Sequence, residues 1–172
     1  RAGVRLDMLA STQHDQQAEA DYARLRSVRI TTARDAVRWR LIDRGGRYHF
    51  ASFAPMRAAA QRQRIQVIWA LCHYGWPDDV DVFAPAFVDR FARFARATAR
   101  FVREHSDVVP YYTPINEMSY LAWAAGDAQY FHPFASGRGY ELKRQLTRAA
   151  ISAMEEVWAV DGRARFVHVD PI

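Results

Sequence analysis

Ionisable and polar side chains directly follow apolar segments at four places in this chain. They are Arg38 and Arg40, His73 with Tyr74, Asn116 with Glu117, and His168 with Asp170. Burying a charge is costly unless it is paired, and parallel α/β folds bind ligands where strands run into the following loops. A carboxylate at such a position, as Glu117 is, therefore needs a partner or a function. Most other glutamates fall on predicted helices, where a solvated face explains them: Glu19, Glu104, Glu141, Glu155 and Glu156.

Alternating strands and helices are predicted to position these side chains. Apolar residues at the helical period predict helices over residues 15–26, 52–63, 85–105 and 140–160. Ser52 is expected to cap the second helix, and a phenylalanine stripe on the third is expected to face the core. Short apolar or alternating runs predict strands over 36–42, 65–72, 108–115 and 166–169, although Pro110 and Pro114 argue against a regular central strand in the third. Residues 118–138 are expected to form a long loop.

The order of these elements predicts a parallel α/β sheet with right-handed crossovers. An open doubly wound sheet and part of a barrel both satisfy the order. The phosphate-binding patterns G-x-G-x-x-G and G-x-x-x-x-G-K-[ST] do not occur. The chain has 172 residues, and a complete (β/α)₈ barrel usually needs about 250. We therefore expect residues 1–172 to form one domain, incomplete if the fold is a barrel.

Four segments, in matching order and spacing, resemble family 1 glycoside hydrolases, which are β-glucosidase-type enzymes. Tyr112-Thr-Pro-Ile-Asn-Glu117 resembles the T-x-N-E-P segment that closes strand four of that family, and Leu71-Cys-His-Tyr-Gly-Trp-Pro77 resembles the L-H-H-W-D-L-P segment that closes strand three. Val37-Arg-Trp-Arg40 resembles F-R-F-S of strand two, and residues 21–25 resemble the E-D-x-x-L helix before it. The resemblance implies a (β/α)₈ TIM barrel represented from about the first helix to strand five.

The resemblance also implies a retaining β-glycosidase that acts on O-glycosidic bonds without a cofactor. Glu117 would be the general acid and then the general base, Asn116 would bond the sugar 2-hydroxyl, and His73 would bond another hydroxyl. Arg38 would hold the nucleophile as an anion, and aromatic rings would stack on sugars, namely Tyr74, Trp76 and Trp123. The nucleophile belongs on strand seven, beyond residue 172. Four departures from the family segments leave the substrate open: Met118, Gly75, Cys72 and Thr113.

Other interpretations of these residues stay open. Glu117 is alternatively a structural carboxylate paired with Arg38 or Arg40, and His73 is a core histidine. Arg38 fits a role in a structural ion pair as well as it fits the role of holding the nucleophile as an anion. Two sets fit a plainer role than catalysis or stacking: His168 with Asp170 as a strand-end turn, and Trp76 with Trp123 as loop packing. The protein as a whole is alternatively a non-catalytic carbohydrate-binding or scaffold barrel.

The composition of the chain limits which partners, cofactors and cellular settings are expected. The formal charge is +5, with Lys143 the only lysine. The arginines are scattered among alanines, which favours solvated helix faces over a nucleic-acid partner. The single cysteine, Cys72, excludes an intramolecular disulfide, and no ligand spacing indicates a metal. A reducing, cytoplasmic setting fits, and a secreted protein without disulfides would have the same cysteine content. No apolar run approaches the roughly 20 residues of a membrane span. We expect a glycoside substrate as partner, with self-association of this segment possible.

Overall fold

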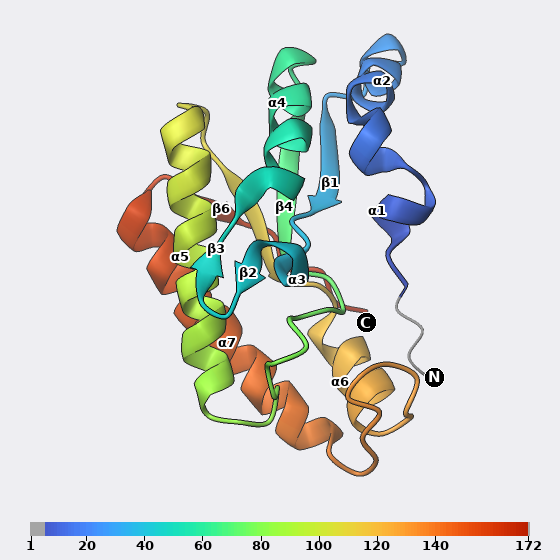
Figure 1. Cartoon of the computed structure of the whole chain (residues 1–172), viewed down its shortest axis with the longest axis vertical. Helices are drawn as coiled ribbons and strands as arrows, with labels where there is room; N and C mark the ends of the chain where they lie inside the picture. The colour runs from blue at the N-terminus through green and yellow to red at the C-terminus, as the bar shows by residue number, and fades with distance from the viewer. Residues whose placement is uncertain (1–5, 172) are drawn as a thin grey trace.

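The computed structural model describes residues 6–171. The elements follow one another along the chain (Figure 1), and their bounds are α1 Met8–Ser11, α2 His14–Ser27, β1 Thr32–Ala36, α3 Trp39–Ile42, β2 Asp43–Arg44, β3 Arg47–Tyr48, the 3₁₀ turn Phe50–Ser52, α4 Ala54–Arg62, β4 Gln66–Cys72, α5 Ala86–His105, β5 Tyr111–Ile115, α6 Met118–Gly126, α7 Gly139–Val160 and β6 Arg165–Phe166.

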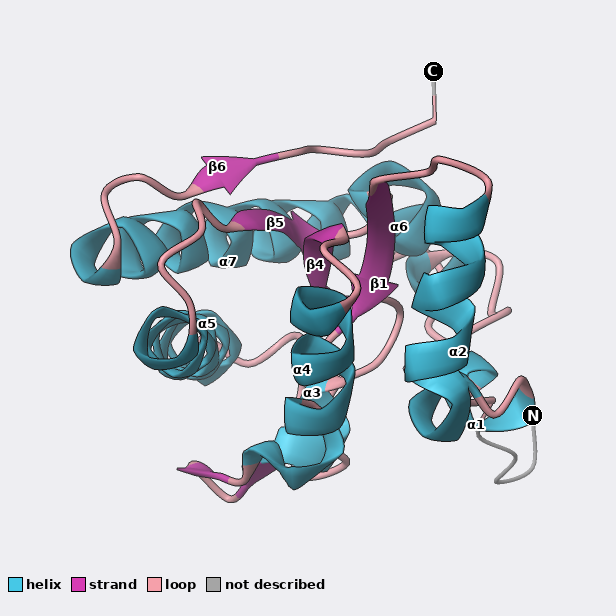
Figure 2. Ribbon diagram, turned by 90° about the horizontal axis from the view of Figure 1, so that it is seen from above, coloured by secondary structure: helices cyan, strands magenta, loops and turns pink. Residues whose placement is uncertain are grey.

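Four strands form one parallel sheet in the order β1-β4-β5-β6. The spatial order equals the chain order, so every crossover moves in the same direction. Right-handed crossovers then place all the connecting helices on one face of the sheet. The helices α4, α5 and α7 connect successive strands along the chain, as Figures 1 and 2 show. This arrangement is that of consecutive units of a (β/α) barrel, because a doubly wound sheet reverses direction and carries helices on both faces.

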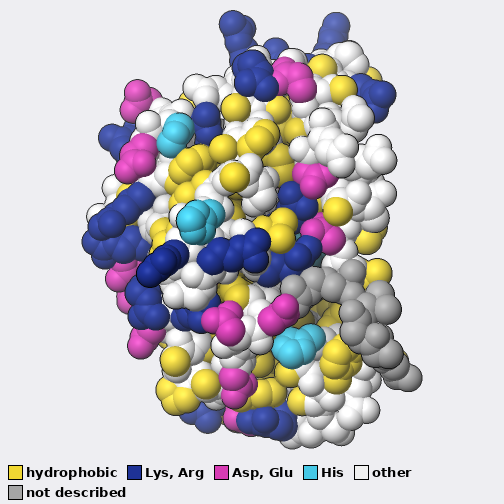
Figure 3. All heavy atoms as spheres, in the orientation of Figure 1, with side chains coloured by type: hydrophobic (Ala, Val, Ile, Leu, Met, Phe, Trp, Pro, Cys, Tyr) yellow, Lys and Arg dark blue, Asp and Glu magenta, His cyan; other side chains and the backbone are white. Residues whose placement is uncertain are grey.

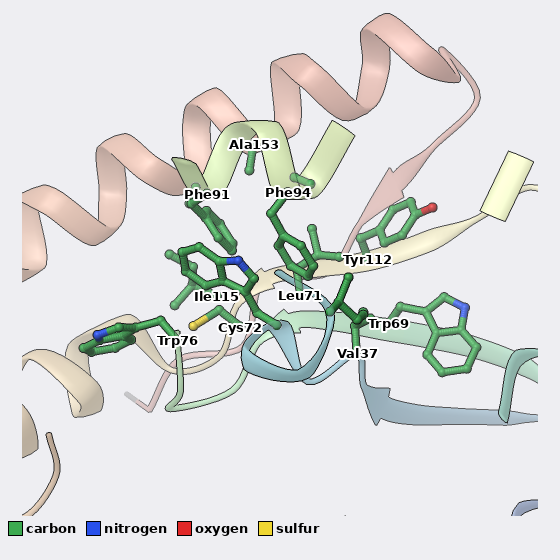
Figure 4. Packing of buried hydrophobic residues seen from close by; sticks show 14 of the residues in the cluster. Val37, Trp69, Leu71, Cys72, Trp76, Phe91, Phe94, Tyr112, Ile115 and Ala153 are labelled. Carbon is green, nitrogen blue, oxygen red and sulfur yellow. The ribbon is translucent and has the colours of Figure 1, made fainter. Parts of the chain in front are cut away.

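The core lies between this sheet and its helices. The predicted stripe on α5 is confirmed, because Phe87, Phe91, Phe94 and Thr98 are buried. Figure 4 shows Phe91 and Phe94 beside strand residues that include Leu71, Ile115 and Tyr112. The opposite face is more open: the strand register places Arg34, Ile68, Tyr111 and Arg165 in one row across the four strands, and none of them is buried.

The predicted strand over residues 36–42 is wrong. β1 lies earlier, at Thr32–Ala36, and its ladder ends one residue later, where the Val37 amide donates to the Ala70 carbonyl at 2.9 Å. Residues 39–42 form the helical turn α3, which buries Trp39 and Ile42. The alternation of Val37, Trp39 and Leu41 imitated a strand because a single helical turn after a strand is too short to show its own period.

The predicted loop over residues 118–138 is also wrong, because its first part is the helix α6. The run Met118–Gly126 is apolar on nearly every side, so it shows no polar face from which a helix is recognised. Gly126 is required by close packing, since a Cβ atom there would lie 2.6 Å from the Cα of Gly139 at the start of α7. Ser52 does not cap α4, whose N-cap is Phe53. β5 is a central strand although it contains Pro114.

A buried carboxylate joins α3 to α5. Asp43 is 2% exposed and accepts hydrogen bonds from Trp39 Nε1 at 3.1 Å, Gly46 N at 2.7 Å and Arg90 Nε at 2.9 Å. A second guanidinium nitrogen of Arg90 reaches the other carboxylate oxygen at 3.1 Å. The carboxylate is therefore satisfied on both oxygens, which is the condition under which a buried charge is tolerated.

Removal of this carboxylate is expected to destabilise the fold strongly. Asp43→Ala leaves the indole N–H and the Arg90 guanidinium without their buried partner, so we expect the free energy of unfolding to fall by about 3–5 kcal/mol. Urea denaturation followed by circular dichroism measures the change. The matched control is Asp79→Ala, because Asp79 binds the same arginine at 2.7 Å while its side chain is 57% exposed. The control should lose no more than about 1 kcal/mol, and equal losses in both variants would contradict the buried role of Asp43.

None of the helices within residues 6–171 is long and apolar enough to cross a membrane. On the face shown in Figure 3, arginine and lysine side chains lie at several separate places, with acidic and apolar side chains between them.

Candidate active site

The strands leave the sheet through a recurring backbone turn. Arg38, Tyr74 and Glu117 each lie two positions after the last residue of β1, β4 and β5, and each has a left-handed backbone, with φ of 56°, 60° and 46°. Residues other than glycine adopt this conformation at a cost, and such strain concentrates at functional sites. The turn places Tyr74 and Glu117 together at the carboxyl edge of the sheet.

A chain of hydrogen bonds connects three strands at this edge. Arg34 of β1 donates from its guanidinium to Asn116 Oδ1. Asn116 is 1% exposed, and its Nδ2 donates to the Tyr74 hydroxyl at 3.1 Å. Tyr74 in turn donates to Glu117 Oε2. The sequence-predicted residues Asn116, Glu117 and Tyr74 are thus brought together, with Arg34 as an additional member.

His73 lies beside the same amide, with its Nε2 at 3.4 Å from Asn116 Nδ2. An amide nitrogen only donates, so Nε2 must accept and the ring must be neutral with its proton on Nδ1. Two effects lower the pKa of His73: desolvation of the ring and the nearby Arg34 guanidinium, while Glu117 acts in the opposite direction.

The Tyr74 hydroxyl keeps its own proton. Burial raises the pKa of Tyr74, and its hydrogen bond to Glu117 and the charge of that carboxylate raise it further. The Tyr74 ring is held between His73, at 4.8 Å between ring centroids, and Phe131, which is stacked at 5.4 Å. The hydroxyl is therefore fixed in position and acts as a hydrogen-bond donor.

Arg38 does not join this group, contrary to the sequence prediction. Its guanidinium binds Asp7 at 3.3 Å and Asp15 at 3.1 Å, which ties the α1–α2 region to the exit of β1. Arg40 also binds Asp7. The cause is the strand shift, because β1 ends at Ala36 and Arg34 is the arginine that it carries. Arg34 was missed because Thr32–Ala36 has a weak apolar pattern, and only the position of Trp39 in α3 shows where the strand ends.

The aromatic residues fall into two groups. Trp76 is 3% exposed and packs against Phe87, with ring centroids 6.0 Å apart, so it belongs to the core. Trp123 on α6 is 48% exposed and contacts Tyr120 at 5.8 Å and Tyr130 at 5.4 Å. Tyr120 lies 5.8 Å from Tyr74. Exposed rings therefore extend from the hydrogen-bonded group along α6, where a sugar ring or an apolar substituent has a surface to stack on.

The segment that follows β6 makes a structural contact with the start of α6. Asp170 accepts from the Ser119 backbone amide at 2.9 Å and from the Ser119 hydroxyl, and the Val169 carbonyl accepts from the Glu117 amide at 2.8 Å. These bonds hold the start of α6 and the backbone of Glu117.

Within residues 6–171, no group of three or more His, Cys, Asp or Glu side chains is placed to hold a metal ion.

Comparisons with known proteins find similarity in structure only. No family model matches the chain, and no curated protein sequence matches it. Among solved structures, the family 1 β-glucosidase from Thermotoga maritima superimposes with a TM-score of 0.82 at 13% identity, over 91% of this chain and 38% of that one. The same enzyme in complex with deoxynojirimycin gives 0.82 at 14%, over 91% and 37%. The AHE enzyme from Alicyclobacillus herbarius gives 0.79 at 15%, over 89% and 36%.

These matches agree with the barrel architecture that the strand order indicates. The chain spans less than two fifths of the length of these barrel proteins, yet almost all of it superimposes on them. The chain therefore has the fold of part of the (β/α)₈ barrel found in β-glucosidases.

Proposed function

We propose that this chain carries the acid/base part of a retaining β-glycosidase-like hydrolase acting on O-glycosidic bonds of carbohydrates. The observation that supports it most is the group at the carboxyl edge, where Glu117 lies next to the buried Asn116 and within hydrogen-bonding distance of Tyr74. The structural similarity to β-glucosidases agrees with this proposal at the level of the fold.

The chemistry needs two carboxyl groups with different tasks. One protonates the leaving-group oxygen and later deprotonates water, and the other attacks the anomeric carbon from about 5–5.5 Å away. Glu117 takes the first task. Asn116 bonds the sugar 2-hydroxyl, His73 contacts another hydroxyl, and Trp123 stacks on a ring beyond the cleavage point. The nucleophile is expected on strand seven, beyond residue 172, and Arg34 replaces Arg38 as the arginine of the site.

A second candidate, a non-catalytic carbohydrate-binding barrel, is favoured by one observation. The other carboxylate at this edge, Asp170, is engaged by Ser119. Within residues 6–171 no carboxylate other than Glu117 is hydrogen-bonded to Asn116 or Tyr74. Such a site binds sugars without cleaving them unless a second carboxylate joins it.

The stereochemistry of hydrolysis separates the two functions. We expect the intact protein to cleave an aryl β-glycoside and to release the β-anomer first, because two displacements restore the configuration. Proton NMR of the anomeric signals during the first minutes measures this. Release of the α-anomer would contradict the retaining mechanism, and binding of the sugar without turnover would establish the second candidate.

A further inference from the structure

The start of helix α6 needs a hydrogen-bond acceptor that the side chain of Glu117 does not supply. We propose that Asp170 is a positioning residue for Glu117, because it caps α6 from the segment after β6 and so leaves the Glu117 side chain free to reach Tyr74. The capping is a property of this chain alone, whereas its consequence for catalysis rests on the function proposed above.

Glu117 occupies the N-cap position of α6. A side chain at this position normally accepts a hydrogen bond from the second or third backbone amide of its helix. Those amides have no partner within the helix, and the positive end of the helix dipole favours a carboxylate beside them. The Glu117 side chain makes no such bond, and its Oε2 is hydrogen-bonded to the Tyr74 hydroxyl instead. The first turn of α6 therefore depends on an acceptor from elsewhere.

Asp170 provides this acceptor. Its Oδ1 accepts from the backbone amide of Ser119, the second residue of α6, at 2.9 Å, and its Oδ2 accepts from the Ser119 hydroxyl. The Ser119 oxygen also accepts from Lys143 Nζ of α7 at 2.8 Å, and an ammonium group only donates, so the hydroxyl proton is left for Asp170. Both oxygens of Asp170 are thus engaged by one residue at the start of the helix.

The residue before Asp170 holds the backbone of Glu117. The Val169 carbonyl accepts from the Glu117 amide at 2.8 Å. Glu117 has φ of 46° and ψ of 61°, a left-handed conformation that is unfavourable for a residue with a Cβ atom and persists where surrounding contacts hold it. Val169 and Asp170 bind the amides of Glu117 and Ser119, and these bonds fix the direction in which the Glu117 side chain leaves the backbone.

Loss of the Asp170 carboxylate should redirect Glu117. In Asp170→Ala the Ser119 amide has no acceptor, so the Glu117 carboxylate is expected to fold back onto the start of α6, as N-cap side chains do. Asp170→Asn should keep the native arrangement, because asparagine caps helices about as well as aspartate. Asp170 is exposed, so both variants are expected to fold.

NMR of the 172-residue chain tests the capping directly. Nuclear Overhauser contacts between the Tyr74 ring and the Glu117 side chain should be lost in Asp170→Ala and retained in Asp170→Asn. The matched control is Asp127→Ala, because Asp127 accepts from the Gly139 amide at the start of α7 at 2.8 Å and its loss removes the same kind of bond from another helix. Contacts that persist in Asp170→Ala, or that are lost equally in Asp127→Ala, would overturn the proposal.

Kinetics of the intact protein test the consequence for catalysis. A displaced acid slows the step that needs its proton, so Asp170→Ala should lower kcat/KM for an alkyl β-glycoside by about 10–100-fold. The value for a dinitrophenyl β-glycoside, whose leaving group needs little assistance, should change little. Asp170→Asn should recover most of the loss.

Two kinetic results would contradict a positioning role. Equal losses on both substrates would show that Asp170 acts on the whole site and not through Glu117, and no recovery in Asp170→Asn would show that its charge takes part in the reaction. Loss of the contacts between Tyr74 and Glu117 in an Asp170→Ala protein whose wild type has no turnover would defeat the proposed function and leave the capping inference standing.

Discussion

Glu117→Gln should reduce turnover of a β-glycoside with a poor, alkyl leaving group by about 10²–10⁴-fold in the intact protein. The amide has no acidic proton to deliver to the departing oxygen. A glycoside with a dinitrophenyl leaving group needs little assistance, so the glycosyl-enzyme should still form and then accumulate, because the general base for the second step is also missing. Pre-steady-state kinetics should therefore show a burst of dinitrophenol followed by a slow phase. The leaving-group dependence separates an acid from a structural carboxylate.

Glu104→Gln is the matched control for this prediction. Glu104 is exposed on α5, so the substitution removes the same charge far from the carboxyl edge of the sheet. It should leave both substrates unaffected. If Glu117→Gln lowers activity equally on both substrates, the carboxylate acts through the shape of the site and not through its proton. External azide should restore turnover of the activated substrate if the covalent intermediate is trapped, since azide needs no general base.

The positions of several candidate site residues could be predicted from the sequence, because a buried strand ends where its apolar run ends. β4 and β5 are apolar runs whose ends are marked by the first polar residues, so His73, Tyr74, Asn116 and Glu117 were placed within one or two positions. β1 has no such marker, since Thr32–Ala36 includes Arg34 and Asp35 within the strand. Asp35 is used on the helix side, where it accepts from the Tyr22 hydroxyl at 2.8 Å, and Arg34 is used on the other face. The two charged residues of this strand are held by tertiary partners, so the local sequence gives no apolar pattern that marks its position.

The hydrogen-bond chain from Arg34 to Glu117 could not be predicted from the sequence, for a different reason. Tyr74 was expected to stack on a sugar, but its ring is occupied by Phe131 and its hydroxyl by Glu117. Phe131 lies in the segment that was predicted as a loop without regular structure. The helix α6, which precedes it, brings the Phe131 ring back to the Tyr74 ring. The role of Tyr74 thus depends on a contact between residues 57 positions apart (131 − 74). Spacing along the chain does not encode such contacts.

The 172-residue chain on its own should hydrolyse no aryl β-glycoside. A retaining site needs a second carboxylate about 5–5.5 Å from the first, across the scissile bond. Asp170, in the segment that follows β6, is instead held by two hydrogen bonds to Ser119 at the start of α6. In the described structure β1 and β6 each pair on one side only, and the row from Arg34 to Arg165 is not covered by the helices. Unpaired strand edges favour association, so we also expect the chain to self-associate.

An assay of the purified chain with 4-nitrophenyl β-glucoside, combined with light scattering for the mass in solution, tests both expectations together. Turnover should stay at the level of the Glu117→Gln variant of the same chain, and the measured mass should exceed that of one 19.8 kDa chain. Activity well above that level from a monomer, abolished by Asp170→Asn, would identify Asp170 as the nucleophile and refute its placement on strand seven. Activity that rises with the square of the concentration would instead indicate that a second copy supplies the missing carboxylate, since a site shared between two chains forms only on association.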